Sequence, residues 1–269
     1  MTALYGLIGE KLSHSISPAI HLELFKRLNM DADYKLFEIK KPELKTVFSQ
    51  LKNSGIKGLN VTIPYKVETM NFLDEISHEA KKIGAINTIC FQDNKIIGHN
   101  TDYFGFGRML GKNNIAIKGK TVVILGAGGA AKAVIQHMID NNAKKVILVS
   151  RDTTNAAKNF KGLEIIDYEQ LDLLNAGDIL INCTPVGMYP NISNLPLNEN
   201  FVTKFSIAVD LIYNPCETLF LKIAKKNGLK NVNGLYMLVS QAIYSEELWN
   251  NIHVDETVID EIFNNLRTL

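Results

Sequence analysis

The segment from Lys120 to Ile139 constrains the fold of this chain more than any other part of the sequence. It opens with a nearly unbroken apolar run, KTVVILG, passes through the glycine-rich stretch GAGGA and continues with helical periodicity to about residue 140. Such a run is typical of a strand buried on both faces of a parallel sheet. Glycines spaced G-x-G-x-x-A between a strand and a helix permit a tight turn and bring the helix N-terminus close to a pyrophosphate. The segment therefore predicts a dinucleotide-binding βαβ unit.

Strand-like and helix-like patterns alternate through the rest of the chain. Further strand patterns occupy residues 4–9, 33–39, 57–63, 86–91, 95–99, 144–150, 178–184 and 206–212. Alternation of this kind indicates an α/β fold with parallel sheets. We predict two domains: an N-terminal α/β substrate domain of residues 1–102 and 238–269, and a doubly wound Rossmann-type nucleotide-binding domain of residues 103–237. The amphipathic helical pattern at the C-terminus is expected to return to the first domain.

Composition excludes several classes of partner. The 29 basic and 28 acidic residues leave a formal net charge of +1, which offers no electrostatic attraction for nucleic acid or an anionic membrane surface. No apolar run is long enough to span a bilayer, and the N-terminus lacks the pattern of a signal peptide. The three cysteines are far apart in sequence, which is typical of reduced thiols in the cytoplasm. The six histidines form no metal-ligand cluster, so we expect no metal.

The cofactor is predicted from the end of the second strand of this βαβ unit. Enzymes that use NAD commonly place an acidic residue there, on the 2′-hydroxyl of the adenosine ribose, whereas an arginine suits the 2′-phosphate of NADP. Here the strand ends in Ser150-Arg151-Asp152, so NADP is favoured, while Asp152 keeps NAD as an alternative. The residues predicted to cradle the pyrophosphate form one continuous loop: Gly126, Ala127, Gly128, Gly129 and Ala130.

A nicotinamide cofactor carries hydride chemistry, so the first domain must supply a substrate site and a proton. Pro18 suits the first turn of a helix, with Ser17 as its N-cap and Ser15 just before it. Hydroxyls at a helix start could hold a small carboxylate, although capping alone also explains Ser17. Asn87 could exchange hydrogen bonds with substrate hydroxyls, or it could simply end a turn.

Lys66 and Asp102 each follow a predicted strand, in the segments NVTIPYK and HNTD. A lysine paired with a carboxylate at neighbouring strand ends could donate a proton to a carbonyl oxygen as hydride arrives. From spacing alone, a solvated loop lysine and a common Asn-Thr-Asp turn are favoured over such a pair.

Taken together, the motifs resemble the shikimate dehydrogenase family over nearly the whole chain. The segments that carry the resemblance are HSISP (14–18), NVTIPYK (60–66), GAINT (84–88), HNTD (99–102), GAGGA (126–130), NCTPVGM (182–188), DLIYNP (210–215) and NGLYMLVSQA (233–242). The resemblance implies reduction of 3-dehydroshikimate to shikimate with NADPH, on the route to chorismate and the aromatic amino acids.

The resemblance also assigns roles to individual residues. It makes Lys66 the catalytic lysine and Asp102 its paired carboxylate. The residues that it implies on the substrate side are Ser15 and Ser17 for the carboxylate, Thr62, Asn87 and Gln241 for the ring hydroxyls, and Tyr213 near the nicotinamide. On the cofactor side it implies the loop from Gly126 to Ala130, Arg151 at the adenosine phosphate, and Gly234 and Met237 at the nicotinamide end.

The helical pattern independently predicts that Gly234, Met237 and Gln241 share one helix face, although core packing also explains Met237. Three other hypotheses stay open on the sequence. They are a quinate/shikimate dehydrogenase that uses NAD, a protein similar to methylenetetrahydrofolate dehydrogenase, and a dinucleotide-binding regulator without chemistry. The motifs HSISP and NTD argue against the second, and the presence of both Lys66 and Asp102 argues against the third. We expect a monomer or a homodimer acting on a small molecule.

Overall fold

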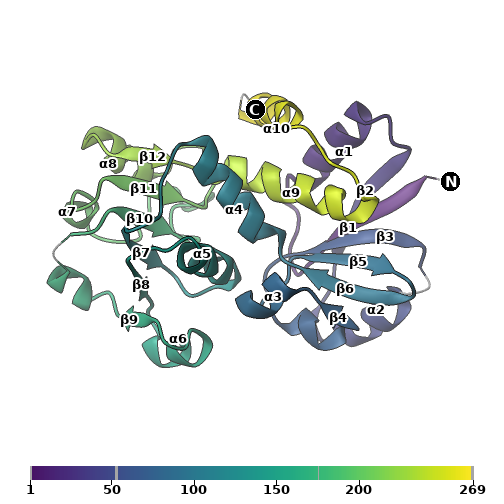
Figure 1. Ribbon diagram of the computed structural model, residues 1–269, viewed down its shortest axis with the longest axis horizontal. Helices are drawn as coiled ribbons and strands as arrows, with labels where there is room; N and C mark the ends of the chain where they lie inside the picture. Colours follow the sequence, from purple (N-terminus) through teal and green to yellow (C-terminus); the bar gives the residue numbers. More distant parts are fainter. Residues whose placement is uncertain (1, 52–53, 175, 268–269) are drawn as a thin grey trace. The chain divides into compact units, whose positions relative to one another are not determined.

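The computed structural model describes residues 2–51, 54–174 and 176–267, which form two compact units (Figure 1). The first comprises Met1–Gly105 and Leu238–Leu269, and the second comprises Phe106–Met237. The chain leaves the first unit within α4 (Thr101–Lys112) and returns to it within α9 (Leu235–Asn250). Among the described residues, no helix is both long enough and apolar enough to cross a membrane.

The first unit is built on a six-stranded sheet with the order β2-β1-β3-β5-β6-β4. Its strands are β1 (Ala3–Gly9), β2 (Ala32–Glu38), β3 (Ile56–Val61), β4 (Glu75–Ile76), β5 (Thr88–Gln92) and β6 (Lys95–His99). The sheet is mixed rather than parallel throughout, because β5 runs antiparallel to both β3 and β6. Only Asp93 and Asn94 join β5 to β6, and both have positive φ angles, 51° and 61°. A two-residue turn of this kind produces an antiparallel hairpin.

Helices pack around this sheet. They are α1 (Ser17–Arg27), the 3₁₀ turn η1 (Lys41–Glu43), α2 (Leu44–Leu51), η2 (Glu68–Phe72), α3 (His78–Ile83), α9 and α10 (Glu256–Arg267). Of these, α10 packs against α1. Side chains alternate along β1, so that Tyr5 and Leu7 join the core shared with Phe25 of α1 and Trp249 of α9. Ile8 faces the opposite core, beneath α2 and α3.

The C-terminal segment returns to the first unit as the sequence predicts. The Trp249 indole Nε1 donates to the Ile89 carbonyl at 2.9 Å. His21 of α1 and Glu246 of α9 form a buried pair with Nδ1 and Oε1 2.6 Å apart. Through these contacts α9 is hydrogen-bonded to both β5 and α1.

The second unit contains a fully parallel sheet with the order β12-β11-β10-β7-β8-β9. Its strands are β7 (Thr121–Leu125), β8 (Lys145–Val149), β9 (Glu164–Ile166), β10 (Ile179–Asn182), β11 (Ile207–Asp210) and β12 (Lys230–Val232). Its remaining helices are α5 (Gly129–Asp140), α6 (Thr153–Asn159), η3 (Gln170–Leu173), α7 (Glu199–Val202) and α8 (Leu219–Lys226). Numbered from β7, the order is the 3-2-1-4-5-6 arrangement of a doubly wound dinucleotide-binding fold.

The sequence pattern missed three strands, β4, β9 and β12. Each has only two or three residues and lies at an edge of its sheet. So short a strand cannot display a period-2 pattern, and an edge strand is only partly buried. The strand predicted at 57–63 also ends early, at Val61, because the chain turns there and the Tyr65 N–H bonds to the Thr62 carbonyl at 2.9 Å.

Candidate active site

The order of strands in the first unit brings several predicted site residues to one edge of the sheet. β1 and β3 are parallel, and β6 runs in the same direction as β3 because each is antiparallel to β5. The segments with Ser15 and Ser17, with Thr62 and Lys66, and with Asp102 follow β1, β3 and β6, so they start from the same edge. Asn87 immediately precedes β5 and starts from this edge as well.

Lys66 and Asp102 form an ion pair, whereas spacing alone favoured a solvated loop lysine. The Lys66 ammonium lies 2.5 Å from Asp102 Oδ2, and the two side chains are only 13% and 8% exposed. The neighbouring Tyr65 anchors the lysine, since its ring is fully buried and its hydroxyl donates to the Ile39 carbonyl at 2.6 Å. The Ile86 N–H also donates to the Lys66 carbonyl at 2.8 Å. Lys66 is thus held at a largely buried position and is not a solvated loop charge.

Asn87 joins this pair through its side-chain amide. Its Nδ2 donates to Asp102 Oδ1 at 2.9 Å, and its Oδ1 accepts the Thr101 backbone N–H at 2.7 Å. Because a backbone N–H can only donate, the Thr101 contact fixes which end of the amide faces Asp102. Gln241 Oε1 lies 3.2 Å from the same Asn87 nitrogen. The structure therefore brings together Lys66, Asp102, Asn87 and Gln241.

Ser15 and Ser17 occupy the entry to α1, but not in the predicted capping arrangement. The helix N-cap is Ile16, with no side-chain cap, and Ser17 is already helical. The Ser15 hydroxyl instead accepts the Ser17 N–H at 3.3 Å. Within the described part of the chain, the hydrogen bonds of the Lys66–Asp102 pair do not extend to these serines or to Thr62. The prediction that Ser17 caps the helix was wrong, so the Ser17 hydroxyl takes no part in capping.

The glycine-rich loop of the second unit has the geometry that a phosphate cradle requires. Gly126 has a φ of +93°, a conformation that residues with a side chain rarely adopt. Gly128 is the N-cap of α5, and a Cβ at this glycine would meet no atom within 4 Å. The first turn of α5 carries no acidic residue that would repel an anion. The loop thus has open space at Gly128, at the N-terminus of α5, and a dinucleotide pyrophosphate fits there.

Arg151 and Asp152 lie between β8 and α6. Asp152 caps α6 by accepting the Asn155 N–H at 2.9 Å, while Arg151 is exposed. The buried Ser150 hydroxyl bonds within the same turn, donating to the Asp152 carbonyl at 3.1 Å. Burial raises the pKa of Tyr168, and the nearby Arg151 charge opposes that rise. The carboxylate that would favour NAD is therefore engaged in capping, while the guanidinium is available to an anion.

The residues predicted at the nicotinamide end lie in the second unit. Gly234 precedes α9, which begins at Leu235, so the prediction that Gly234 shares a helix face with Met237 and Gln241 was wrong. Its N–H donates to the Ile212 carbonyl at 3.0 Å, and the chain packs so closely there that a Cβ would lie 2.0 Å from the Leu211 oxygen. Met237 is buried, and burial raises the pKa of Tyr213.

Comparison with known proteins identifies the family. Residues 7–89 match the family described as "Shikimate dehydrogenase substrate binding domain", and residues 109–190 match "Shikimate / quinate 5-dehydrogenase". A protein of Clostridium perfringens named shikimate dehydrogenase (NADP(+)) is 51% identical over 266 residues, which cover 98% of each chain. This chain belongs to the shikimate dehydrogenase family.

Solved structures of the family share the fold over the full length. A chorismate mutase/shikimate 5-dehydrogenase fusion protein from Clostridium acetobutylicum is 51% identical, with a TM-score of 0.97 over 100% of this chain and 98% of the other. A shikimate dehydrogenase in complex with NADP⁺ is 36% identical, with a TM-score of 0.88 over 100% of this chain and 96% of the other.

The structure adds polar residues that the sequence did not single out. In the first unit, Thr101 touches Asn87 through both its backbone N–H and its hydroxyl. In the second unit, Asn182 at the end of β10 donates to Asp210 Oδ1 at 3.0 Å, and the Thr218 hydroxyl donates to Asp210 Oδ2 at 2.6 Å. All three of these second-unit residues are buried. These residues lie in or near the motifs NCTPVGM and DLIYNP, and that position was the signal that could have found them. Nothing in the sequence indicated that Asn182 and Asp210, which are 28 positions apart, would form a hydrogen bond.

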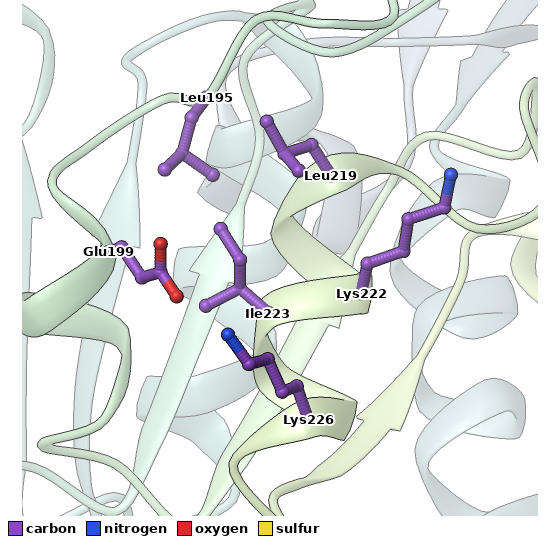
Figure 2. A pocket seen from close by; sticks show the side chains of 6 residues that line it. All are labelled: Leu195, Glu199, Leu219, Lys222, Ile223 and Lys226. Carbon is purple, nitrogen blue, oxygen red and sulfur yellow. The ribbon is translucent and has the colours of Figure 1, made fainter.

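A separate cavity of about 310 Å³ lies beside α8 in the second unit (Figure 2). It is lined by Leu195, Glu199, Leu219, Lys222, Ile223 and Lys226, none of which is a predicted site residue. The Lys226 side chain reaches toward Glu199, while the Lys222 ammonium points away from it (Figure 2). The two lysine side chains thus extend in different directions from α8 (Figure 2).

Proposed function

We propose that this chain is an NADP-dependent shikimate dehydrogenase. It reversibly reduces 3-dehydroshikimate to shikimate on the route to chorismate and the aromatic amino acids. The observation that carries the proposal is the partly buried Lys66–Asp102 pair, at a sheet edge shared with the segments of Ser15, Ser17, Thr62 and Asn87. The name of the relative from Clostridium perfringens and the complex of a related structure with NADP⁺ support the same activity.

The first unit binds the substrate and supplies the proton for the reaction. NADPH, when bound, would supply the hydride that the C3 carbonyl carbon of 3-dehydroshikimate accepts. As charge develops on the carbonyl oxygen, Lys66 donates a proton from Nζ, and Asp102 holds that ammonium in place through its 2.5 Å contact. Ser15 and Ser17 bind the substrate carboxylate. The ring hydroxyls contact Thr62, Asn87 and Gln241, and Tyr213 lies on the substrate side near the nicotinamide.

The second unit binds the cofactor. The loop of Gly126, Ala127, Gly128, Gly129 and Ala130 would hold the pyrophosphate at the N-terminus of α5, where the backbone N–H groups of a first helical turn favour an anion. Ser150 and the exposed Arg151 hold the adenosine 2′-phosphate. Gly234 and Met237 accommodate the nicotinamide end, and the close packing at Gly234 explains why no side chain is present there.

The variant Lys66→Ala tests the proton-donor role. We expect kcat to fall by roughly 10²-fold or more, while shikimate affinity measured by calorimetry changes far less, because the lysine acts mainly in the transition state. Lys57→Ala is the matched control, since Lys57 lies on β3 of the same unit with an exposed side chain. A Lys66→Ala protein that loses only affinity and keeps its turnover would refute the assignment.

Cofactor and substrate choice are tested together in one spectrophotometric assay. Shikimate and quinate are each offered with NADP⁺ and with NAD⁺. We expect the highest kcat/KM with shikimate and NADP⁺, and we expect Arg151→Ala to raise the KM for NADP⁺ more than that for NAD⁺, because only NADP⁺ carries the 2′-phosphate. Preference for quinate with NAD⁺ would instead support an NAD-using quinate/shikimate dehydrogenase.

We further propose that the enzyme works in the cytoplasm as a monomer or homodimer, with neither a membrane nor a nucleic acid as partner. The near-neutral charge and the separated cysteines support this setting. Cell fractionation tests the location, and light scattering coupled to gel filtration measures the mass against 30.0 kDa for one chain.

A further inference from the structure

Behind Asn87, the first unit contains a buried cluster of polar side chains that the proposed chemistry does not use. Thr88 is its centre. The Thr88 hydroxyl lies 3.1 Å from Asn60 Nδ2, 3.1 Å from Asn87 Oδ1, 3.1 Å from Thr101 Oγ1 and 2.9 Å from Ser245 Oγ. These neighbours come from β3, the residue before β5, α4 and α9.

The cluster lies where a sheet and a covering helix normally bury apolar side chains. Thr88, Thr101 and Ser245 are fully buried, and Asn60 is only 5% exposed. A buried polar group that loses its partner is costly, whereas apolar side chains of similar size would pack there without such a demand. The packing of the fold therefore does not explain why these four positions are polar.

A contact with a backbone carbonyl determines which groups of the cluster donate hydrogen bonds and which accept them. Asn60 Nδ2 lies 3.3 Å from the Asn87 carbonyl, which can only accept, so Asn60 Oδ1 must face Tyr34. The Tyr34 hydroxyl, 2.8 Å away, is then the donor. Burial raises the pKa of Tyr34 well above its usual range, so this hydroxyl keeps its proton at neutral pH.

The same direction continues to the ion pair. Ser245 donates its only hydroxyl proton to the Gln241 carbonyl at 3.0 Å, so toward Thr88 and Asn60 it can only accept. Thr88 has one hydroxyl proton, which it can give to only one acceptor. When that proton is donated to Asn87 Oδ1, and Asn87 Nδ2 donates to Asp102, a donor chain runs from Tyr34 through Asn60, Thr88 and Asn87 to the carboxylate. Ser245 then accepts from Asn60 Nδ2, 2.9 Å away. Donors aligned in one direction polarise one another and strengthen the last bond.

We propose that Asn60, Thr88 and Ser245 are positioning residues, which together with the Thr101 N–H hold the Asn87 amide in the orientation that keeps Asp102 aligned with Lys66. The inference rests on the proposed dehydrogenase function. None of the three needs to touch substrate; they act through Asn87. Misplacing a catalytic group lowers the rate of the chemical step more than it lowers the strength of ground-state binding.

The test compares Thr88→Val with Thr88→Ser. Valine keeps the shape but removes the hydroxyl, so we expect kcat to fall about tenfold with KM for shikimate changed by less than about threefold. Serine restores the hydroxyl and should recover most of the turnover. Ser245→Ala removes one acceptor of the cluster and should lower kcat about threefold.

Two matched controls separate this role from the loss of any buried hydroxyl. Thr69 and Ser240 are fully buried in the same unit, and within the described structure their hydroxyls have no hydrogen-bond partner. Thr69→Val and Ser240→Ala should therefore leave kcat unchanged. A crystal structure of Thr88→Val should show the Asn87 amide turned or shifted away from Asp102.

The outcomes distinguish this inference from the function on which it rests. Wild-type protein that does not oxidise shikimate with NADP⁺ would overturn the proposed function. The Thr88→Val structure would still decide whether the cluster orients Asn87. With an active wild type, the positioning role is overturned by full turnover in Thr88→Val, or by a tenfold rise in KM at unchanged kcat. If Thr88→Val does not fold, full turnover in Ser245→Ala overturns it as well.

Discussion

Asp210 should make the stability of the second unit depend on pH in a direction opposite to that of most carboxylates. This side chain lies at the end of β11, is fully buried, and accepts hydrogen bonds from Asn182, Thr218 and the Ile212 N–H. Burial raises its pKa from the usual value near 3.8 to about 6, and the three donors only partly oppose that rise. The folded protein therefore holds this proton at pH values where the unfolded chain has released it.

The magnitude follows from the difference between the two pKa values. Stability contributed by the protonated group is fully present below about pH 4 and is lost as the pH rises through about 6. A shift of roughly two units corresponds to roughly 3 kcal/mol between these limits. The variant Asp210→Asn cannot titrate at this position. The free energy of unfolding of the wild type minus that of Asp210→Asn should therefore decrease by roughly 3 kcal/mol from pH 4 to pH 7.

Urea denaturation followed by circular dichroism is the suitable assay, because the single tryptophan, Trp249, belongs to the first unit and its fluorescence would not report on the second. Subtracting the variant cancels the titration of all groups that both proteins share. A difference that stays constant, or that increases with pH, would refute the argument that burial outweighs the three donors. Carbon NMR of the Asp210 carboxyl would then show a pKa near or below the usual value.

Two further predictions concern the folded structure alone. Gly234→Ala should destabilise the protein by more than about 3 kcal/mol in thermal or urea denaturation, because its Cβ would overlap the Leu211 oxygen at 2.0 Å. The control Gly111→Ala, on a helix with open space around the glycine, should instead add roughly 0.5–1 kcal/mol, and equal effects at both sites would contradict the packing argument. Tyr65→Phe should cost about 1–3 kcal/mol, since it leaves the buried Ile39 carbonyl without its donor; an unchanged melting temperature would speak against that hydrogen bond.

Part of the candidate site could be predicted because its chemistry is local in sequence. The loop from Gly126 to Ala130 has the spacing that a tight strand-to-helix turn demands, and the structure has that turn, with Gly126 at φ +93°. Ser17 shows the limit of such local argument. Pro18 indicated the helix start correctly, but the capping position fell on Ile16, because the identity of a residue does not determine where the first helical φ and ψ values occur.

Other parts of the site depend on how strands are ordered. Lys66 and Asp102 are 36 positions apart, and they meet only because β3 and β6 run in the same direction on either side of β5. Spacing along the chain contains no information about that order, so Lys66 could not be distinguished from a solvated loop lysine by its neighbours alone. The donor chain centred on Thr88 is still less visible, since its members come from separate strands and helices.

The sequence by itself determined the α/β class, the βαβ unit with its glycine loop, and the family, because apolar periodicity, glycine spacing and motif order are all properties of neighbouring residues. The tertiary structure alone decided that Lys66 is paired and partly buried, that Asp152 is engaged in capping while Arg151 is exposed, and that Asn87 faces Asp102 with its nitrogen. The physical reason is that burial and hydrogen-bond partners arise from strand order and register. These bring together residues that no local pattern connects.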